Sequence, residues 1–136
     1  MYQIGLIRSF SARHFLVGGD WGQENRLHGH DYTVEWSLSG PELDANGFLL
    51  DLVAVASLLE EALGDIRGAT LNELAAFQGV NPSVERLCRL LSERLVAARP
   101  RWDTSFRLTG SRIKVFESSD AWASWSVVLP GASEAS

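Results

Sequence analysis

The stretch that decides the fold is His28–Gly40, HGHDYTVEWSLSG. From residue 30 to residue 40 apolar and polar side chains alternate, which is the period of a β-strand with one buried face. Residues 2–17 alternate more loosely, and we expect them to form a preceding strand that pairs antiparallel with this one. The expected buried face of the strand at 30–40 consists of Tyr32, Val34, Trp36 and Leu38.

Downstream of this strand pair, the spacing of the apolar residues changes to that of a helix. Residues 48–66, FLLDLVAVASLLEEALGDI, predict a first helix with a buried stripe of Leu52, Val55, Leu59 and Leu63. A second helix is expected to begin with Asn81 as its N-cap and Pro82 in its first turn. Its expected buried stripe is Val84, Leu87, Cys88, Leu91 and Leu95.

Two further strands are expected at residues 105–117 and 121–129, joined by a turn at residues 118–120. The order of elements is therefore ββααββ. This order predicts an α+β fold, a two-layer sandwich of a four-stranded antiparallel sheet and two helices. We expect a single domain over residues 1–130 and a disordered tail over residues 131–136. A four-stranded sheet has at least one bare edge, which favours oligomerisation by strand pairing.

The composition argues against several classes of partner. The 136-residue chain has a net charge of -5 and no basic run, so no nucleic acid is expected. No apolar stretch approaches the roughly 20 residues that span a bilayer, so no membrane is expected. The N-terminus lacks the pattern of a signal peptide, and we expect a cytoplasmic protein. The one cysteine, Cys88, lies on a helical apolar stripe and is expected to belong to the core.

All three histidines of the chain belong to the first strand pair. His28 and His30 are two residues apart and share a strand face, and His14 lies at the end of the preceding strand, where it can supply a third nitrogen. Three imidazoles around zinc leave one coordination position open, which is typical of a catalytic site. The sequence therefore predicts a zinc site of His14, His28 and His30. Tyr32 is assigned to the opposite strand face and is left out of this site.

Six short motifs cover most of the chain: FSARH (10–14), LHGHDYTVE (27–35), GFLLDL (47–52), TLNEL (70–74), NPSVERL (81–87) and KVFES (114–118). In this order they resemble the 6-pyruvoyl-tetrahydropterin synthase and 6-carboxy-tetrahydropterin synthase family. The resemblance implies the tunnelling fold, in which sheets of several subunits close into a β-barrel, as a trimer or as a hexamer of stacked trimers. It also implies active sites between subunits and zinc binding by the three histidines. Glu117 is then the residue that anchors a pterin, because a carboxylate accepts two parallel N–H bonds from a planar N–C–N group.

The chain departs from this family at the usual proton-transfer residues. The cysteine four residues before H-G-H is replaced by Glu24, and the Asp and His that precede L-N are replaced by Arg67 and Gly68. Some family members with glutamate at the first position are aldolase-like lyases that cleave the side chain of dihydroneopterin. Such a cleavage begins with loss of a hydroxyl proton, which a carboxylate can accept, so Glu24 is the predicted general base. Arg67 is either a clamp for a substrate carboxylate or a surface residue.

The sequence therefore predicts a zinc-dependent lyase whose substrate is a small molecule with vicinal oxygens, with a dihydropterin as the leading candidate. Two alternatives stay open. One is a zinc-dependent cyclase or dehydratase of specialised metabolism that acts on a non-pterin substrate. The other is a non-catalytic, zinc-bearing homo-oligomer that binds a ligand. Trp21, in the same loop as Glu24, can close over a flat ligand.

Overall fold

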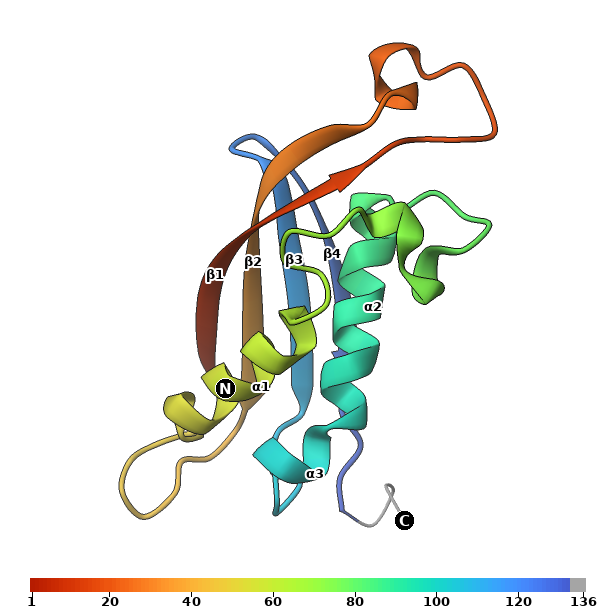
Figure 1. Ribbon diagram of the computed structural model, residues 1–136. Helices are drawn as coiled ribbons and strands as arrows, with labels where there is room; N and C mark the ends of the chain where they lie inside the picture. The colour runs from red at the N-terminus through yellow and green to blue at the C-terminus, as the bar shows by residue number, and fades with distance from the viewer. Residues whose placement is uncertain (133–136) are drawn as a thin grey trace.

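The computed structural model describes residues 1–132 as an antiparallel sheet covered by helices (Figure 1). The sheet contains four strands in the order β1-β2-β3-β4. Its strands are β1 (Tyr2–His14), β2 (His28–Gly40), β3 (Gly110–Ser118) and β4 (Ala121–Val128). The helices are α1 (Leu52–Leu63), α2 (Val84–Ala97) and the short α3 (Arg99–Trp102). Residues 1–132 also form three 3-10 turns, namely η1 (Gly22–Asn25), η2 (Leu71–Glu73) and η3 (Ala75–Phe77).

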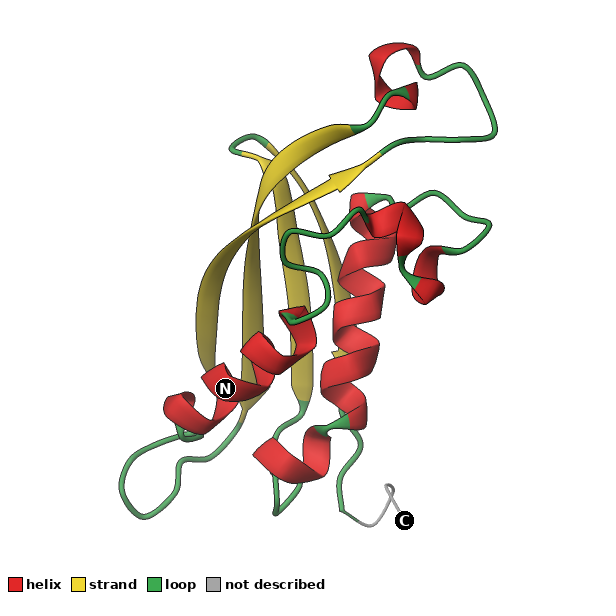
Figure 2. Ribbon diagram, in the orientation of Figure 1, coloured by secondary structure: helices red, strands yellow, loops and turns green. Residues whose placement is uncertain are grey.

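The helices form one layer and the sheet forms the other (Figure 2). The helix-facing side of β2 is the centre of the core, because Tyr32, Val34, Trp36 and Leu38 are each at most 1% exposed. The indole nitrogen of Trp36 donates to the hydroxyl of Ser111 on β3, so this buried polar atom is paired. The predicted α+β sandwich and the buried face of its second strand are therefore confirmed.

The β1–β2 hairpin extends beyond the rest of the sheet. These two strands pair over their full length, from Tyr2 opposite Gly40 to His14 opposite His28. β3 accompanies β2 only as far as Thr33, which lies opposite Phe116. The far end of the hairpin therefore projects past β3 and β4, and it carries residues 15–27 as a long loop (Figure 1).

Three strand ends differ by two residues or more from those expected. β1 stops at His14 rather than at residue 17, β2 begins at residue 28 rather than 30, and β3 begins at Gly110 rather than at residue 105. The late start of β3 has a local cause, since the Asp103 carboxylate accepts hydrogen bonds from the backbone N–H groups of Arg107 and Leu108. These bonds hold the segment in a turn instead of an extended strand.

The N-cap of α2 is Ser83, and the prediction of Asn81 was wrong. The Ser83 hydroxyl accepts a hydrogen bond from the backbone N–H of Arg86, as an N-cap does. The Asn81 side chain instead bonds the backbone of Val17, in the loop after β1. The cap therefore lies two residues later than expected, and Asn81 is available for another role.

The buried stripe of α1 also differs at its first position. Leu52 is 40% exposed rather than buried, because it is the first residue of the helix, directly after the N-cap Asp51. The other predicted members, Val55, Leu59 and Leu63, are buried, and Leu58 and Ala62 join them. In α2 the predicted stripe holds at Leu87, Cys88, Leu91 and Leu95, while Val84 is half-buried.

None of the helices found in residues 1–132 has the length and apolar character that a membrane crossing requires. The predicted tail at residues 131–136 lies, from residue 133 onward, outside the described residues. The domain boundary at residue 130 stays a prediction.

Candidate metal centre

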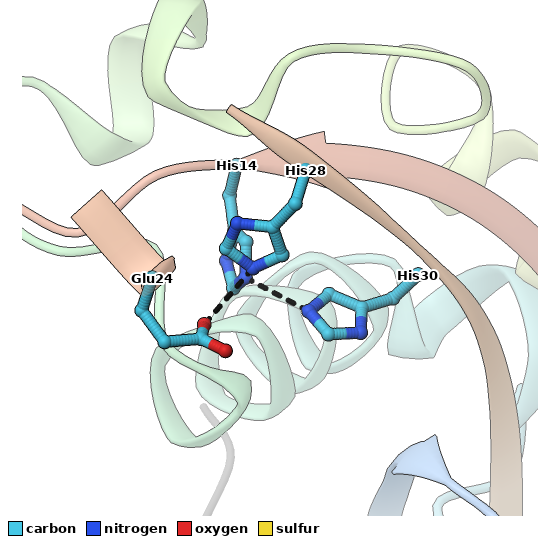
Figure 3. Close-up of side chains that lie close together, drawn as sticks. All are labelled: His14, Glu24, His28 and His30. Carbon is cyan, nitrogen blue, oxygen red and sulfur yellow. Dashed lines mark hydrogen bonds and ion pairs between the residues drawn. The ribbon is translucent and has the colours of Figure 1, made fainter. Parts of the chain in front are cut away.

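The three histidines converge at the projecting end of the β1–β2 hairpin (Figure 3). The register places His14 directly opposite His28, and Ala12 opposite His30. All three side chains point to the helix-facing side of the sheet, and their ring centroids lie 4.5 to 4.9 Å apart. Strand pairing alone therefore brings together the three residues that the sequence singled out.

Hydrogen bonds to the backbone orient two of these rings. Nδ1 of His14 lies 3.0 Å from the carbonyl oxygen of Pro82, and Nδ1 of His28 lies 2.7 Å from that of Arg26. A carbonyl oxygen only accepts, so Nδ1 carries the hydrogen in both rings and, in the neutral ring, Nε2 carries a lone pair. Such an outer hydrogen bond is the usual support of a metal-binding imidazole.

The inner nitrogens are close together and poorly satisfied. Nε2 of His30 lies 3.1 Å from Nε2 of His14. Nε2 of His28 is buried and makes no well-aligned hydrogen bond with any described residue, although a Glu24 carboxylate oxygen lies 2.9 Å from it. Lone pairs that face one another at this distance repel unless a proton or a cation lies among them. The donor set therefore fits a divalent metal that prefers imidazole nitrogen, of which zinc is the commonest.

Glu24 completes the cluster from the long loop. It lies in η1, and its Oε2 is 2.9 Å from Nε2 of His28. One donor atom from each of His14, Glu24, His28 and His30 lies within 4.8 Å of all the others. The close-up shows how these four side chains gather (Figure 3). The Glu24 side chain is about half exposed, at 48%, so it lies at the rim of the site rather than inside it.

A second carboxylate reaches the site from β3. Oε1 of Glu117 lies 3.2 Å from Nε2 of His30. Glu117 sits at an irregularity in the pairing of β3 with β4, between Phe116 and Ser118. Burial lowers the pKa of His30 below its ordinary value of 6.5, and the negative charge of Glu117 opposes this shift. The ring is therefore neutral at neutral pH, as a metal ligand must be.

Tyr32 lies beside the histidines, and the prediction that it faces the other way was wrong. Residues 28, 30 and 32 have the same parity on β2, so they share one face. The Tyr32 ring is 5.5 Å from the ring of His30 and stacks on Phe10 at 5.1 Å. Burial, with smaller contributions from Glu117 and Glu24, raises the pKa of the Tyr32 phenol well above its ordinary value. Tyr32 is therefore a buried side chain with a neutral phenol that borders the site.

Arg67 lies outside the cluster. Its guanidinium donates to both carboxylate oxygens of Glu60 and to the backbone carbonyl of Ser9. The next residue, Gly68, has a φ of 70° and donates its N–H to the carbonyl of Ser11. These bonds cover part of the outer edge of β1. The two positions that carry an acid and a histidine in the family therefore hold edge-covering residues here.

Trp21 packs on its own loop. Its indole nitrogen donates to the carbonyl of Val17, and its ring lies against Gly19 so closely that an added Cβ there would sit 3.0 Å from it. The ring is 49% exposed. Closure of Trp21 over a ligand stays a prediction.

The long hairpin, the histidine cluster and the two-layer sandwich define the class: an α+β sandwich with a candidate metal site at the end of its first hairpin. The model of the 6-pyruvoyl tetrahydropterin synthase family matches residues 3–126. The chain therefore belongs to the 6-pyruvoyl tetrahydropterin synthase family, whose enzymes are lyases.

Individual relatives resemble the chain over different lengths and at different sequence identities. The 6-carboxy-5,6,7,8-tetrahydropterin synthase of Bacillus subtilis is 41% identical over 49 residues, which are 36% of this chain and 34% of the relative. The matched stretch thus spans about a third of that protein. The solved 6-pyruvoyl tetrahydropterin synthase of Caenorhabditis elegans superposes with a TM-score of 0.78 at 18% identity, over 91% of this chain and 94% of that one.

Malarial proteins share the same fold. The 6-pyruvoyl tetrahydropterin synthase of Plasmodium falciparum superposes with a TM-score of 0.73 at 13% identity, covering 93% of this chain and 98% of that chain. The Plasmodium vivax protein is known in two structures described as catalytic residue mutants, each with a glutamate replaced, at a TM-score of 0.66 and 15% identity over 94% of this chain and 99% of the other. At these identities the likeness confirms the tunnelling fold predicted from the motifs.

Proposed function

We propose that this chain is a zinc-dependent lyase that cleaves the side chain of a dihydropterin. The observation that carries the proposal is the meeting of three inward-facing imidazole nitrogens with the Glu24 carboxylate. His14, His28 and His30 would hold the metal. A zinc ion held there would supply a Lewis acid that lowers the pKa of a hydroxyl group within its reach.

Glu24 has the position of a general base for this reaction. Its carboxylate lies at the open rim of the cluster, next to His28, where a substrate hydroxyl can approach it. In an aldol-type cleavage Glu24 accepts the proton of a side-chain hydroxyl, and that oxygen forms a carbonyl as the adjacent carbon–carbon bond breaks. The bonding electrons pass to the carbon attached to the ring, and Glu24 returns the proton to that carbon. Atoms and electrons balance with no further reactant.

The relatives support a glutamate in this role. A glutamate of the Plasmodium vivax protein is described as a catalytic residue, so the same fold uses a carboxylate elsewhere. In this chain the Glu24 carboxylate lies 2.9 Å from Nε2 of His28.

Glu117 is the proposed anchor for the pterin ring. Its contact with His30 places a second carboxylate next to the metal ligands, on the same face of the sheet. A carboxylate can accept two parallel N–H bonds from the amino-pyrimidine edge of a pterin. A dihydropterin carries no carboxylate, and the Arg67 guanidinium is engaged by Glu60 and Ser9, so Arg67 receives no substrate contact in this proposal.

We also propose a homo-oligomer, a trimer or a hexamer, in the cytoplasm. β1 and β4 are the two edges of the sheet. The segment at residues 67–72 covers β1 only from Ser9 onward, and the Arg8 guanidinium donates to the Ile7 carbonyl, which leaves Tyr2–Leu6 for pairing with another chain. Light scattering coupled to size-exclusion chromatography measures the number of chains, and a monomer would contradict the assembly.

The test of the reaction is turnover by the zinc-loaded protein. We expect dihydroneopterin to be consumed, with a hydroxymethyl-dihydropterin and a two-carbon aldehyde as products, both followed by mass spectrometry. Glu24→Gln should lower kcat by about 10²–10⁴-fold while the metal content is unchanged. The matched control is Glu93→Gln, an exposed glutamate on α2 that pairs with Arg89, and it should leave turnover unchanged.

Two outcomes would redirect the proposal. If neither dihydroneopterin nor the pyruvoyl-pterin precursor is consumed, the pterin lyase is wrong and a non-pterin substrate or a binding function takes its place. If turnover is present and survives Glu24→Gln, the base is another group.

A further inference from the structure

The loop that follows β1 is held by side-chain amides instead of by strand pairing. Oδ1 of Asn81 accepts from the N–H of Val17 at 2.8 Å, and Nδ2 of Asn81 donates to the carbonyl of Val17 at 3.1 Å. Asn72 makes the same pair of hydrogen bonds with Phe15: its Oδ1 accepts from the Phe15 N–H at 3.0 Å, and its Nδ2 donates to the Phe15 carbonyl at 2.9 Å. Each amide thus bonds one loop residue as a neighbouring strand would, and the loop continues the line of β1 without a strand beside it.

The segment that carries Asn81 also orients a metal ligand. Pro82 follows Asn81 directly, and its carbonyl oxygen accepts the Nδ1 hydrogen of His14. His14 is only 2% exposed, so water cannot easily replace this acceptor. Asn81 and Pro82 therefore both connect their segment to the end of β1. Asn81 bonds Val17, which is three residues after His14, and Pro82 bonds His14 itself. Asn81 therefore fixes the distance between the end of β1 and the Pro82 carbonyl.

The same loop carries the proposed base. The N–H of Leu16, next to Val17, donates to the backbone carbonyl of Glu24 at 2.8 Å. Asn25, the neighbour of Glu24, donates its amide to the carbonyls of Leu16 and Gly19. The position of Glu24 therefore depends on where Leu16 and Val17 are held.

We propose that Asn81 is a positioning residue, whose amide aligns His14 for the metal and the Glu24 loop for the substrate through one pair of hydrogen bonds to Val17. The inference rests on the metal site of the proposed function. It assigns the Asn81-Pro82 pair at the start of the NPSVERL motif to the site instead of to the cap of α2.

The test measures metal binding in the absence of substrate. Wild-type protein and Asn81→Ala are titrated with cobalt(II), with its visible d–d absorption as the signal, and with zinc in competition with a chelator. Loss of an outer partner of a metal-binding histidine typically weakens metal affinity about 10–100-fold. Asn81→Ala displaces such a partner, the Pro82 carbonyl, without removing it, so we expect a loss near the lower end of this range with an altered cobalt spectrum. Asn81→Asp keeps the acceptor for the Val17 N–H and loses the donor, and an intermediate affinity is expected.

Asp44→Ala is the matched control. The Asp44 carboxylate also accepts two backbone N–H bonds, from Asn46 and Phe48, in an exposed turn away from the histidines. We expect this variant to bind cobalt with the affinity and spectrum of the wild type. Thermal unfolding of the metal-free proteins then separates a loss of fold from a loss of positioning.

The outcomes of this test are distinct. If the wild type and Asn81→Ala bind cobalt equally, with the same spectrum, Asn81 has no positioning role, while the proposed function is untouched. If the metal-free Asn81→Ala protein is folded and binds no more weakly than Asp44→Ala, the inference is likewise overturned. If the wild type itself binds no metal, the proposed function fails first.

Discussion

The ion pair of Arg99, in α3, with Asp103, directly after α3, is buried, and its contacts indicate how much it stabilises the fold. The guanidinium of Arg99 donates twice to Oδ2 of Asp103, at 3.1 and 3.0 Å, and also to the carbonyls of Leu108 and Pro130. The side chains of Arg99 and Asp103 are 4% and 1% exposed. Replacement by Arg99→Met keeps much of the volume, removes all of these bonds and leaves the Asp103 carboxylate buried without its counter-charge.

Breaking a buried pair by removing one partner typically costs about 3–5 kcal/mol. For a chain of this length each kcal/mol lowers Tm by about 3–4 °C, so we expect Arg99→Met to unfold about 9–20 °C below the wild type. Differential scanning calorimetry measures Tm, and urea titration measures the free energy of unfolding.

The control for this variant lies two residues along the chain. Arg101 pairs with Glu61 by two hydrogen bonds, but both side chains are about 60% exposed. Exposed pairs contribute little, so Arg101→Met should leave Tm close to that of the wild type. A loss of stability in Arg99→Met no larger than in Arg101→Met would refute the reasoning from burial.

Three further predictions concern the helices. Burial raises the pKa of the Cys88 thiol to about 11, so at a pH of about 8 only about one thiol in a thousand is ionised. Cys88 should therefore react with a disulfide reagent no faster than the protein unfolds. Rapid labelling of the folded protein would contradict this. A hydrogen bond from Arg94 lowers the pKa of Asp65 below its ordinary value of 3.8. The folded state therefore binds fewer protons there than the unfolded state, and the stabilisation, present above the ordinary pKa, is lost as the pH falls below it. Urea titrations across the acid range should show a shallower fall in stability for Asp65→Asn than for the wild type, and equal slopes would count against the pair. Ser83→Ala should destabilise the protein by about 1 kcal/mol, as the loss of an N-cap does, and an unchanged urea midpoint would mean that Ser83 is not the cap.

The sheet and the clustering of the three histidines were accessible to sequence reasoning because both follow from local periodicity. Alternation along residues 30–40 predicts the buried face of β2, and antiparallel pairing then sets His14 beside His28. The spacing of His28 and His30 places both rings on one side of the strand. The same parity applies to Tyr32, so the sequence also places Tyr32 on the face of the histidines. The assignment of Tyr32 to the opposite face was wrong.

Other parts of the site depend on contacts that no local pattern displays. The acceptors for His14 and His28 are the backbone carbonyls of Pro82 and Arg26. Because every residue has a backbone carbonyl, the residue type does not reveal which one accepts. The Asn81 side chain has two uses with the same sequence signature, a helix cap and a clamp on a distant loop. Only the tertiary structure, which brings Val17 to within 2.8 Å, decides between them.

Arg67 shows the same dependence on tertiary structure. Its residue type is suited to binding a carboxylate, and in the structure it does so, but the carboxylate belongs to Glu60. The sequence indicates that the side chain can bind a carboxylate but does not identify which one.

The most direct test of the whole account is the metal content of the purified protein, measured by elemental analysis after reconstitution and coupled to X-ray absorption at the metal edge. We expect about one zinc per chain, bound by imidazole nitrogens at about 2.0–2.1 Å, and loss of the metal in His28→Ala. A chain that stays folded yet takes up no stoichiometric metal, or a metal retained in full by His28→Ala, would contradict the claim that His14, His28 and His30 form one site.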